Sequence, residues 1–286
     1  MSDQREKFER LKTLHSRGHA SVIPNPWDAG SARLLASLGF EALATTSAGY
    51  AFSKGKRDSF AGLGRSEILE NAAEIVGATT LPVSADLEDG FGVAPETCAE
   101  TIRMACTTGL VGGSIEDATG NPDAPIYDIS QSVERIRAAA EAARNLPFLL
   151  TARAENYLWG RPDLGDTIKR LQAFAEAGAD VLYAPGLPDI EAIRTVCRAV
   201  DKPVQARDSR GGVFRPGRSR RPATCSGGSE GIRHLHLCCG RDSGHRCEPA
   251  HVAGPTRRQA AVEPVQFVEA TRSRKKKPRA MAGLPS

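Results

Sequence analysis

Short apolar runs alternate with amphipathic segments along the first 204 residues of the chain. Each run is short enough to be a buried strand and ends in polar or turn-forming residues. Between the runs, apolar residues recur every three or four positions, as in a helix that packs one face on a sheet. This order predicts a parallel β/α architecture. The runs are residues 20–24, 42–46, 83–85, 113–115, 148–152 and 181–184, with a seventh strand near residue 204.

Seven strands of this kind are most naturally completed as an α/β fold of the (β/α)8 barrel type. In such a barrel the active site lies at the carboxyl ends of the strands. After residue 204 the alternation stops, so the sequence shows no recognisable eighth strand. We therefore expect an incomplete barrel with an unpaired sheet edge beside the first strand.

An acidic cluster follows the strand expected at residues 83–85. Asp86, Glu88 and Asp89 lie at its end, and two glycines follow within three residues. Carboxylates crowd at the end of a buried strand when a cation or a proton-transfer role offsets their repulsion. Acidic turns also occur without any function, so the cluster by itself leaves both interpretations open.

Two further strands end in charged residues. Glu116 follows the strand at 113–115, and Arg153 follows the strand at 148–152. Arg153 could instead form a structural ion pair with Glu155 or Asp117. Because the carboxyl ends of parallel strands share one rim, we expect four side chains to converge there. They are Asp86, Glu88, Glu116 and Arg153.

Composition indicates one catalytic domain followed by a segment of different character. The chain has 286 residues, of which 40% are hydrophobic, and no apolar stretch is long enough to span a membrane. The charged N-terminus lacks the apolar core of a signal peptide, so a cytoplasmic protein is expected. The net charge of +4 is the sum of two unlike parts, because residues 1–204 carry −7 and residues 205–286 carry +11. We therefore expect a barrel domain at 1–204 and a basic tail at 205–286.

The tail is rich in Arg, Gly, Pro and Cys and has few aliphatic residues, a composition that favours disorder. Three interpretations are open: a basic arm that binds nucleic acid or an acidic partner, a zinc site, or a shifted reading frame in a GC-rich gene. The third fits the composition best, and nucleic-acid binding is not expected. The zinc ligands would come from Cys225, His234, His236, Cys238, Cys239, His245 and Cys247, whose spacing is poor for zinc.

The strand-end motifs together resemble the isocitrate lyase/phosphoenolpyruvate mutase superfamily over residues 10–204. Each motif is weak alone, but they occur in the right order at expected strand ends. The motifs are NPWDAGSA at 25–32, TTSAG at 45–49, RD at 57–58, ADLEDGFG at 85–92, IED at 115–117, TAR at 151–153 and GAD at 178–180.

The resemblance implies a helix-swapped barrel, an α-oxo or α-hydroxy carboxylate substrate, Mg²⁺ (or Mn²⁺) and a homo-oligomer. By position, Asp86 corresponds to the direct metal ligand, and Glu88 and Glu116 to residues that hold metal-bound waters. Hard oxygen ligands suit Mg²⁺, which keeps several waters. A bound divalent cation stabilises the enolate left when a bond to the carbon next to a carbonyl is cleaved.

The resemblance also implies substrate contacts and catalytic groups. Arg153 would face the developing negative charge, and one such donor contributes about 3–4 kcal/mol. The expected catalytic residues are Arg153, Asp58 and Glu116. The expected substrate-binding residues are Thr46, Ser47, Ala48, Asn121 and Arg153.

One departure from the superfamily narrows the chemistry. The isocitrate and methylisocitrate lyases carry a Lys-Lys-Cys-Gly-His motif in a lid after the fourth strand, and its cysteine is a general acid. This chain has ATGNPDAP at residues 118–125, with no cysteine. Decarboxylation, phosphonate chemistry or hydrolysis of a small oxo acid, such as oxaloacetate or phosphonopyruvate, is therefore favoured. The alternatives are an inactive truncated derivative or a protein that binds acidic partners through its tail.

Overall fold

The computed structural model describes residues 2–58, 62–206 and 235–239 of the chain. The chain divides into a unit of residues 1–254 and a second unit of residues 255–286, and every described residue belongs to the first. The helices are α1 (Ser2–Ser16), α2 (Ala29–Ser37), α3 (Ser47–Ser53), α4 (Arg65–Gly77), α5 (Pro95–Thr107), α6 (Ile129–Ala143), α7 (Leu164–Glu176) and α8 (Ile190–Ala199). The strands are β1 (Ser21–Pro24), β2 (Leu43–Ala44), β3 (Val83–Asp86), β4 (Gly112–Glu116), β5 (Leu149–Arg153), β6 (Val181–Tyr183), β7 (Val204–Ala206) and β8 (Leu235–Cys239).

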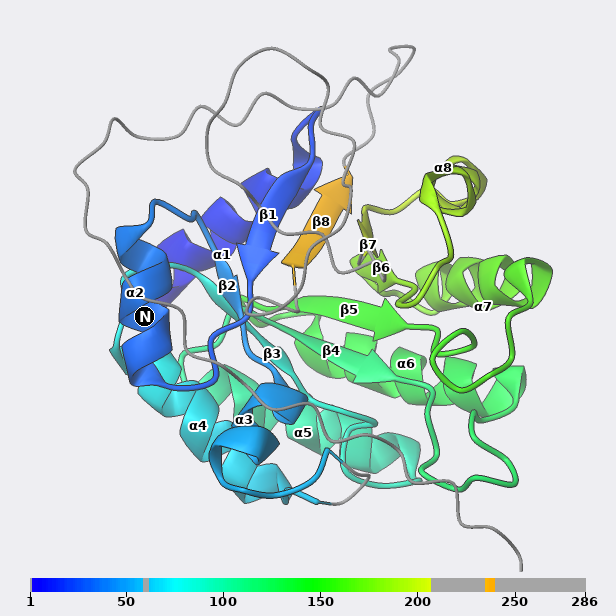
Figure 1. The fold of residues 1–286 in the computed structure, drawn as a ribbon, viewed down its shortest axis with the longest axis horizontal. Coiled ribbons are helices and arrows are strands. Elements are labelled where there is room, and N and C mark those ends of the chain that lie inside the picture. Colours follow the sequence, from blue (N-terminus) through cyan, green and yellow to red (C-terminus); the bar gives the residue numbers. More distant parts are fainter. Residues whose placement is uncertain (1, 59–61, 207–234, 240–286) are drawn as a thin grey trace, which may run out of the picture. The chain divides into compact units, whose positions relative to one another are not determined.

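The strands form one sheet in the order β1-β8-β7-β6-β5-β4-β3-β2. From β2 to β7 every neighbouring pair is parallel, which confirms the predicted β/α architecture. Helices α4 to α7 cover the outside of this parallel part (Figure 1). The register places Glu116 opposite Arg153 at the carboxyl ends of β4 and β5. Parallel pairing therefore brings charged strand ends onto one rim.

The edge beside the first strand is paired, contrary to the expectation of an open edge. β8 lies antiparallel between β1 and β7, with Val22 opposite Leu237 on one side and Ala206 opposite Leu237 on the other (Figure 1). The expectation of an open edge was wrong because β8 is only five residues long and the sequence on either side of it continues no strand pattern. A five-residue strand needs only backbone donors and acceptors on both sides, which β1 and β7 supply.

Asn25 joins the two ends of the hydrogen-bonded order. It follows β1, and its side-chain amide donates to the carbonyl oxygens of Ala44, at 2.7 Å, and Thr45, at 3.2 Å. These carbonyls lie at the end of β2. A side chain therefore links β1 to β2 beside the rim that carries the charged residues.

The core lies between the helices and the sheet and is built from the predicted apolar faces. Ile115, Leu150, Ile102 and Phe174 have no exposed surface. Glycines end α5 and α7, because Gly109 and Gly178 adopt the left-handed conformation that closes a helix. Within the described part of the chain, none of the helices is both long and apolar enough to cross a bilayer.

Three of the predicted zinc ligands, His236, Cys238 and Cys239, belong to β8, and the described residues hold no group of three His, Cys, Asp or Glu side chains that could bind a metal ion. The other four zinc ligands, the basic arm and the C-terminal helices that would be exchanged between subunits lie outside the described residues. The domain boundary at residue 204 stays a prediction.

Candidate active site

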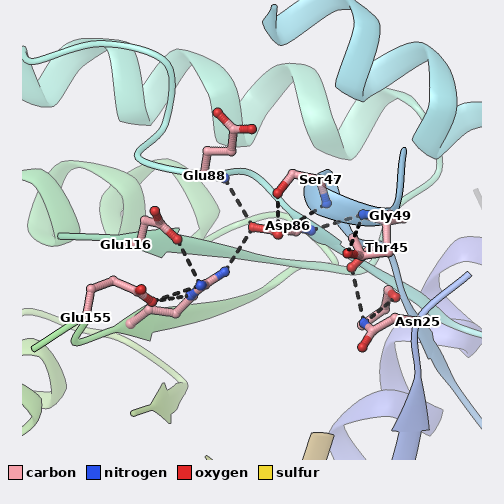
Figure 2. A network of polar contacts seen from close by, with 11 residues as sticks. Asn25, Thr45, Ser47, Gly49, Asp86, Glu88, Glu116 and Glu155 are labelled. Carbon is pink, nitrogen blue, oxygen red and sulfur yellow. Dashed lines mark hydrogen bonds and ion pairs between the residues drawn. The ribbon is translucent and has the colours of Figure 1, made fainter. Parts of the chain in front are cut away.

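Asp86, the last residue of β3, lies at the centre of a polar network at the strand ends (Figure 2). One carboxylate oxygen accepts hydrogen bonds from the Ser47 hydroxyl at 2.9 Å and the Ser47 backbone N–H at 3.3 Å. The other oxygen is 3.0 Å from Nη1 of Arg153. The Asp86 N–H donates to the Thr45 hydroxyl at 3.1 Å. The residue after β2, the first residue of α3 and the last residue of β5 thus fix the backbone and the carboxylate of Asp86.

Arg153, the last residue of β5, binds three carboxylates. Its Nη2 lies 2.9 Å from Glu116 and 2.8 Å from Glu155, and its Nη1 contacts Asp86. Its side chain is only 13% exposed. The structural ion pair with Glu155 therefore exists, whereas the other candidate partner, Asp117, binds only the backbone carbonyl of Arg153. Arg153 can hold these carboxylates together and still face the rim.

Glu88 lies in the loop after β3, with its backbone in the left-handed region at φ 48°. Its N–H donates to Asp86 at 3.4 Å, and Figure 2 shows its side chain pointing away from that carboxylate. Burial, followed by the charges of Asp86, Asp89 and Asp58, raises the pKa of Glu88 to about 8. The Glu88 carboxyl group therefore keeps its proton near neutral pH because it is buried beside other carboxylates.

A buried arginine on α6 holds the loop that carries Glu88. Arg135 is 1% exposed, and it donates to the backbone carbonyls of Asp89, Gly92 and Val93. Its guanidinium also lies 4.4 Å from the centre of the Tyr127 ring. Three carbonyls held by one rigid cation fix the strained backbone of this loop.

Burial and neighbouring charges also shift the pKa values of the other two carboxyl groups at the rim, Glu116 and Asp86. Burial and the charges of Glu155, Asp86 and Glu88 raise the pKa of Glu116 despite Arg153. Burial would also raise the pKa of Asp86, but Arg153 and the hydrogen bonds from Ser47 outweigh it, so the pKa of Asp86 is lowered. Asp86 is therefore the carboxylate that stays ionised most easily.

The other predicted site residues fall into two groups. The side chain of Asp58 is partly open to solvent. Partial desolvation, followed by the charge of nearby Asp86, raises the pKa of Asp58. Thr46 caps α3, accepting a hydrogen bond from the Gly49 N–H at 3.1 Å, and Ala48 lies in the first turn of α3. Asn121 lies apart from the network: it is exposed, and its hydrogen bonds join it to Thr119 and Asp123 in its own turn.

The donor set suits a hard divalent cation. Within the ranges that the structure describes, no three His, Cys, Asp or Glu side chains converge closely enough to hold a metal ion by themselves. Carboxylate oxygens are nevertheless the ligands that Mg²⁺ prefers, and this ion usually keeps several waters. Burial first, and neighbouring carboxylates second, raise the pKa values of Glu88 and Glu116, and a bound cation would lower them.

The sequence pattern did not identify two arginines whose side chains bind residues around the site. Arg135 and Arg170 are almost completely buried, on α6 and α7. The available signal was a charged residue beside the apolar face of each helix. Because arginines often extend from such a position to solvent, the pattern alone did not identify them as buried.

The comparisons with known proteins agree with this architecture. The profile of the phosphoenolpyruvate phosphomutase family matches residues 11–213, about seven tenths of the chain. The chain belongs to this family. Its members include lyases and mutases that act on oxo acids and phosphonates, so the protein is an enzyme of the lyase or mutase kind.

Three relatives illustrate the range. A crystal structure from Burkholderia cenocepacia J2315, of a protein provisionally described as a lyase/mutase, is 59% identical with a TM-score of 0.72, over 75% of this chain and 77% of that one. The 2-methylisocitrate lyase of Escherichia coli K12 is 30% identical over 49% of each chain. The oxaloacetate decarboxylase of Pseudomonas fluorescens is 27% identical over 71% of this chain and 69% of its own length.

Proposed function

We propose that the protein is a Mg²⁺-dependent lyase that acts on a small α-oxo acid and cleaves a carbon–carbon bond to the carbon next to the carbonyl, which leaves an enolate. Oxaloacetate is the first candidate substrate. The observation that carries the proposal is the charge balance at the rim. Three carboxylates, those of Asp86, Glu116 and Glu155, bind the one guanidinium of Arg153, and Glu88 adds a fourth carboxyl group close to Asp86.

Asp86, Glu88 and Glu116 would hold the cation, in part through waters. When bound, Mg²⁺ supplies Lewis-acid stabilisation of negative charge on the substrate's carbonyl oxygen. Asp86 suits the most direct role because its pKa is lowered, and Ser47 holds its carboxylate in place. Glu88 and Glu116 would lose their protons when the cation offsets their mutual repulsion.

Arg153 would stabilise the charge that develops as the bond breaks. In oxaloacetate decarboxylation, the bond to the distal carboxylate breaks and CO₂ leaves. The electron pair stays as the enolate of pyruvate, and a proton then returns to the same carbon. Glu155 and Glu116 hold the guanidinium in a fixed orientation, so this charge is in place before the reaction. Ser47 and Thr46 would contribute hydroxyl or backbone donors to the substrate.

Chemistry that depends on a lid thiol is disfavoured. The segment at residues 118–125 has no cysteine. Cys98 is fully buried on α5, and burial raises the pKa of its thiol to about 11. A thiol that hydrogen-bonds a backbone carbonyl behind the site cannot replace a mobile general acid. This supports the decarboxylase over the 2-methylisocitrate lyase as a guide to the reaction.

The test is a panel of small acids offered to the purified protein with Mg²⁺, with Mn²⁺ and with EDTA. We expect release of CO₂ and pyruvate from oxaloacetate with either metal, and loss of this activity in EDTA. Phosphonopyruvate tests cleavage of a carbon–phosphorus bond, which the family also includes. The proposal fails if no small oxo acid is turned over, or if EDTA leaves the rate unchanged.

Assembly and location are further parts of this proposal. By analogy with the family, a homo-oligomer is expected, and light scattering of the purified chain would measure its mass. A cytoplasmic location is likewise proposed, and cell fractionation tests it.

A further inference from the structure

A second ion pair lies behind the active site, and the reaction does not use it directly. The Asp117 and Arg170 side chains are 2% and 8% exposed, and Nη1 of Arg170 lies 2.9 Å from Asp117 Oδ2. The same nitrogen donates to the Tyr127 carbonyl at 2.8 Å, and Nε of Arg170 binds Asp166 at 2.8 Å. Burying such a pair is costly and rarely improves stability over apolar packing. A role other than stability therefore needs to be considered.

Asp117 binds the backbone at two points immediately after the Arg153 side chain. Its backbone N–H donates to the Arg153 carbonyl at 3.3 Å, and its Oδ1 accepts from the Glu155 N–H at 2.8 Å. β5 ends at Arg153, so beyond this residue the regular ladder with β4 no longer fixes the backbone. The Asp117 carboxylate takes over that function at Glu155.

Glu155 passes this constraint to the guanidinium. Its carboxylate is 2% exposed, and one oxygen accepts from both Nε and Nη2 of Arg153, at 2.9 and 2.8 Å (Figure 2). Two donors on one oxygen fix the direction of the guanidinium plane as well as its position. A shift of the Glu155 backbone would therefore turn Arg153 without removing its charge.

We propose that Asp117, held by Arg170, is a positioning residue that fixes the Arg153 guanidinium through Glu155. The inference rests on the proposed function, in which Arg153 faces the charge that develops on the substrate. The carboxylate of Asp117 contacts neither the carboxylates of the predicted metal ligands nor the rim. Its two oxygens bind Glu155 and Arg170 instead.

The first experiment compares Asp117→Asn with Phe174→Leu. Asparagine offers one acceptor where aspartate offers two, so it cannot satisfy both Glu155 and Arg170. We expect kcat to fall roughly 10- to 100-fold with KM within about threefold, because orientation in the transition state is lost and ground-state binding is kept. Phe174→Leu loosens the core on the same helix as Arg170 and should lower Tm without changing kcat per folded molecule.

A resting-state measurement separates this inference from the proposed function. The Arg153 Nε–H signal in ¹⁵N NMR, assigned by its loss in Arg153→Lys, should be sharp and slow to exchange in the wild type. It should broaden in Asp117→Asn and stay sharp in Phe174→Leu. If no oxo acid is turned over but this pattern is seen, the function fails and the positioning role stands. An unchanged signal in Asp117→Asn overturns the positioning role.

Epistasis tests the route through Glu155. In a Glu155→Gln background, adding Asp117→Asn should lower kcat by less than about twofold, while the loss in Tm persists. Equal losses of kcat in both backgrounds would overturn the route. If Asp117→Asn does not fold, Arg170→Lys provides the milder break, with an expected loss of roughly 3- to 10-fold in kcat and the same NMR broadening. Arg170→Lys with a wild-type signal and kcat would contradict the proposal.

Discussion

The two sides of the sheet are built differently. On the side of β3, β4 and β5, parallel strands are each followed by a helix, and their carboxyl ends carry the charged rim. On the side of β7, β8 and β1, an antiparallel strand joins β7 to β1, and none of the predicted catalytic, substrate-binding or magnesium-binding residues lies on these three strands. The difference indicates that the site geometry and the pairing that joins β1 to β7 belong to separate parts of the molecule. They should therefore respond differently to substitution.

The largest effect is expected from Arg153→Lys on the rim side. Lysine keeps the positive charge but cannot contact Asp86, Glu116 and Glu155 in the same fixed plane. We expect kcat to fall roughly 10²- to 10³-fold, with a small change in Tm. Steady-state kinetics and a thermal melt measure both. A variant that retains more than a tenth of wild-type kcat would show that Arg153 is a structural residue.

The matching substitution on the side of β7, β8 and β1 is Leu237→Pro in β8. Leu237 lies opposite Val22 and Ala206, so its N–H points to β1 or β7, and proline removes that donor. We expect a loss of roughly 1–3 kcal/mol in the free energy of unfolding, measured by urea denaturation. The kcat per folded molecule should not change. Leu237→Val keeps the N–H and is the control; an equal loss in both variants would argue against pairing by β8.

Glu88→Gln measures how much the rim carboxylates lower the free energy of unfolding, an effect that the β8 side should not show. In metal-free protein the folded state keeps the Glu88 proton up to a pKa of about 8, whereas the unfolded state releases it near 4.5. Since the folded state then binds more protons, stability falls as pH rises through this window. Glutamine cannot ionise and avoids that loss. We expect the variant to gain roughly 2–3 kcal/mol over the wild type at pH 8 and nothing at pH 4.

Urea denaturation at pH 4, 6 and 8 with EDTA measures this difference. Adding Mg²⁺ at pH 8 should stabilise the wild type more than the variant, because the cation offsets the Glu88 charge. A difference between the two proteins that does not vary with pH would contradict the raised pKa.

The smallest effect is expected at Asn121, in the segment that could cover the rim. Its hydrogen bonds stay within its own turn, so Asn121→Ala should leave Tm nearly unchanged. If the segment closes on substrate, kcat/KM should fall roughly 3- to 10-fold through the loss of one hydrogen bond. Asp123→Ala, in the same exposed turn, is the control. Identical kinetics for Asn121→Ala and the wild type would remove Asn121 from the substrate site.

The sequence was informative wherever a pattern is local. Strand ends at Asp86, Glu116 and Arg153 could be placed from short apolar runs, because burial of a strand needs only a few consecutive apolar residues. Parallel order then implied that these ends meet. The eighth strand could not be found in this way, since its pairing depends on backbone groups of β1 and β7 that lie far away in the chain.

By itself the sequence determined the β/α order, the family and the carboxylates at the rim, because periodicity and motif spacing are written in neighbouring residues. Only the tertiary structure decided which charges pair. Arg135 reaches a loop more than 40 residues earlier, and Arg170 reaches Asp117, 53 residues away. Whether such a charge is buried and bound depends on groups that folding brings together, so no local pattern specifies it.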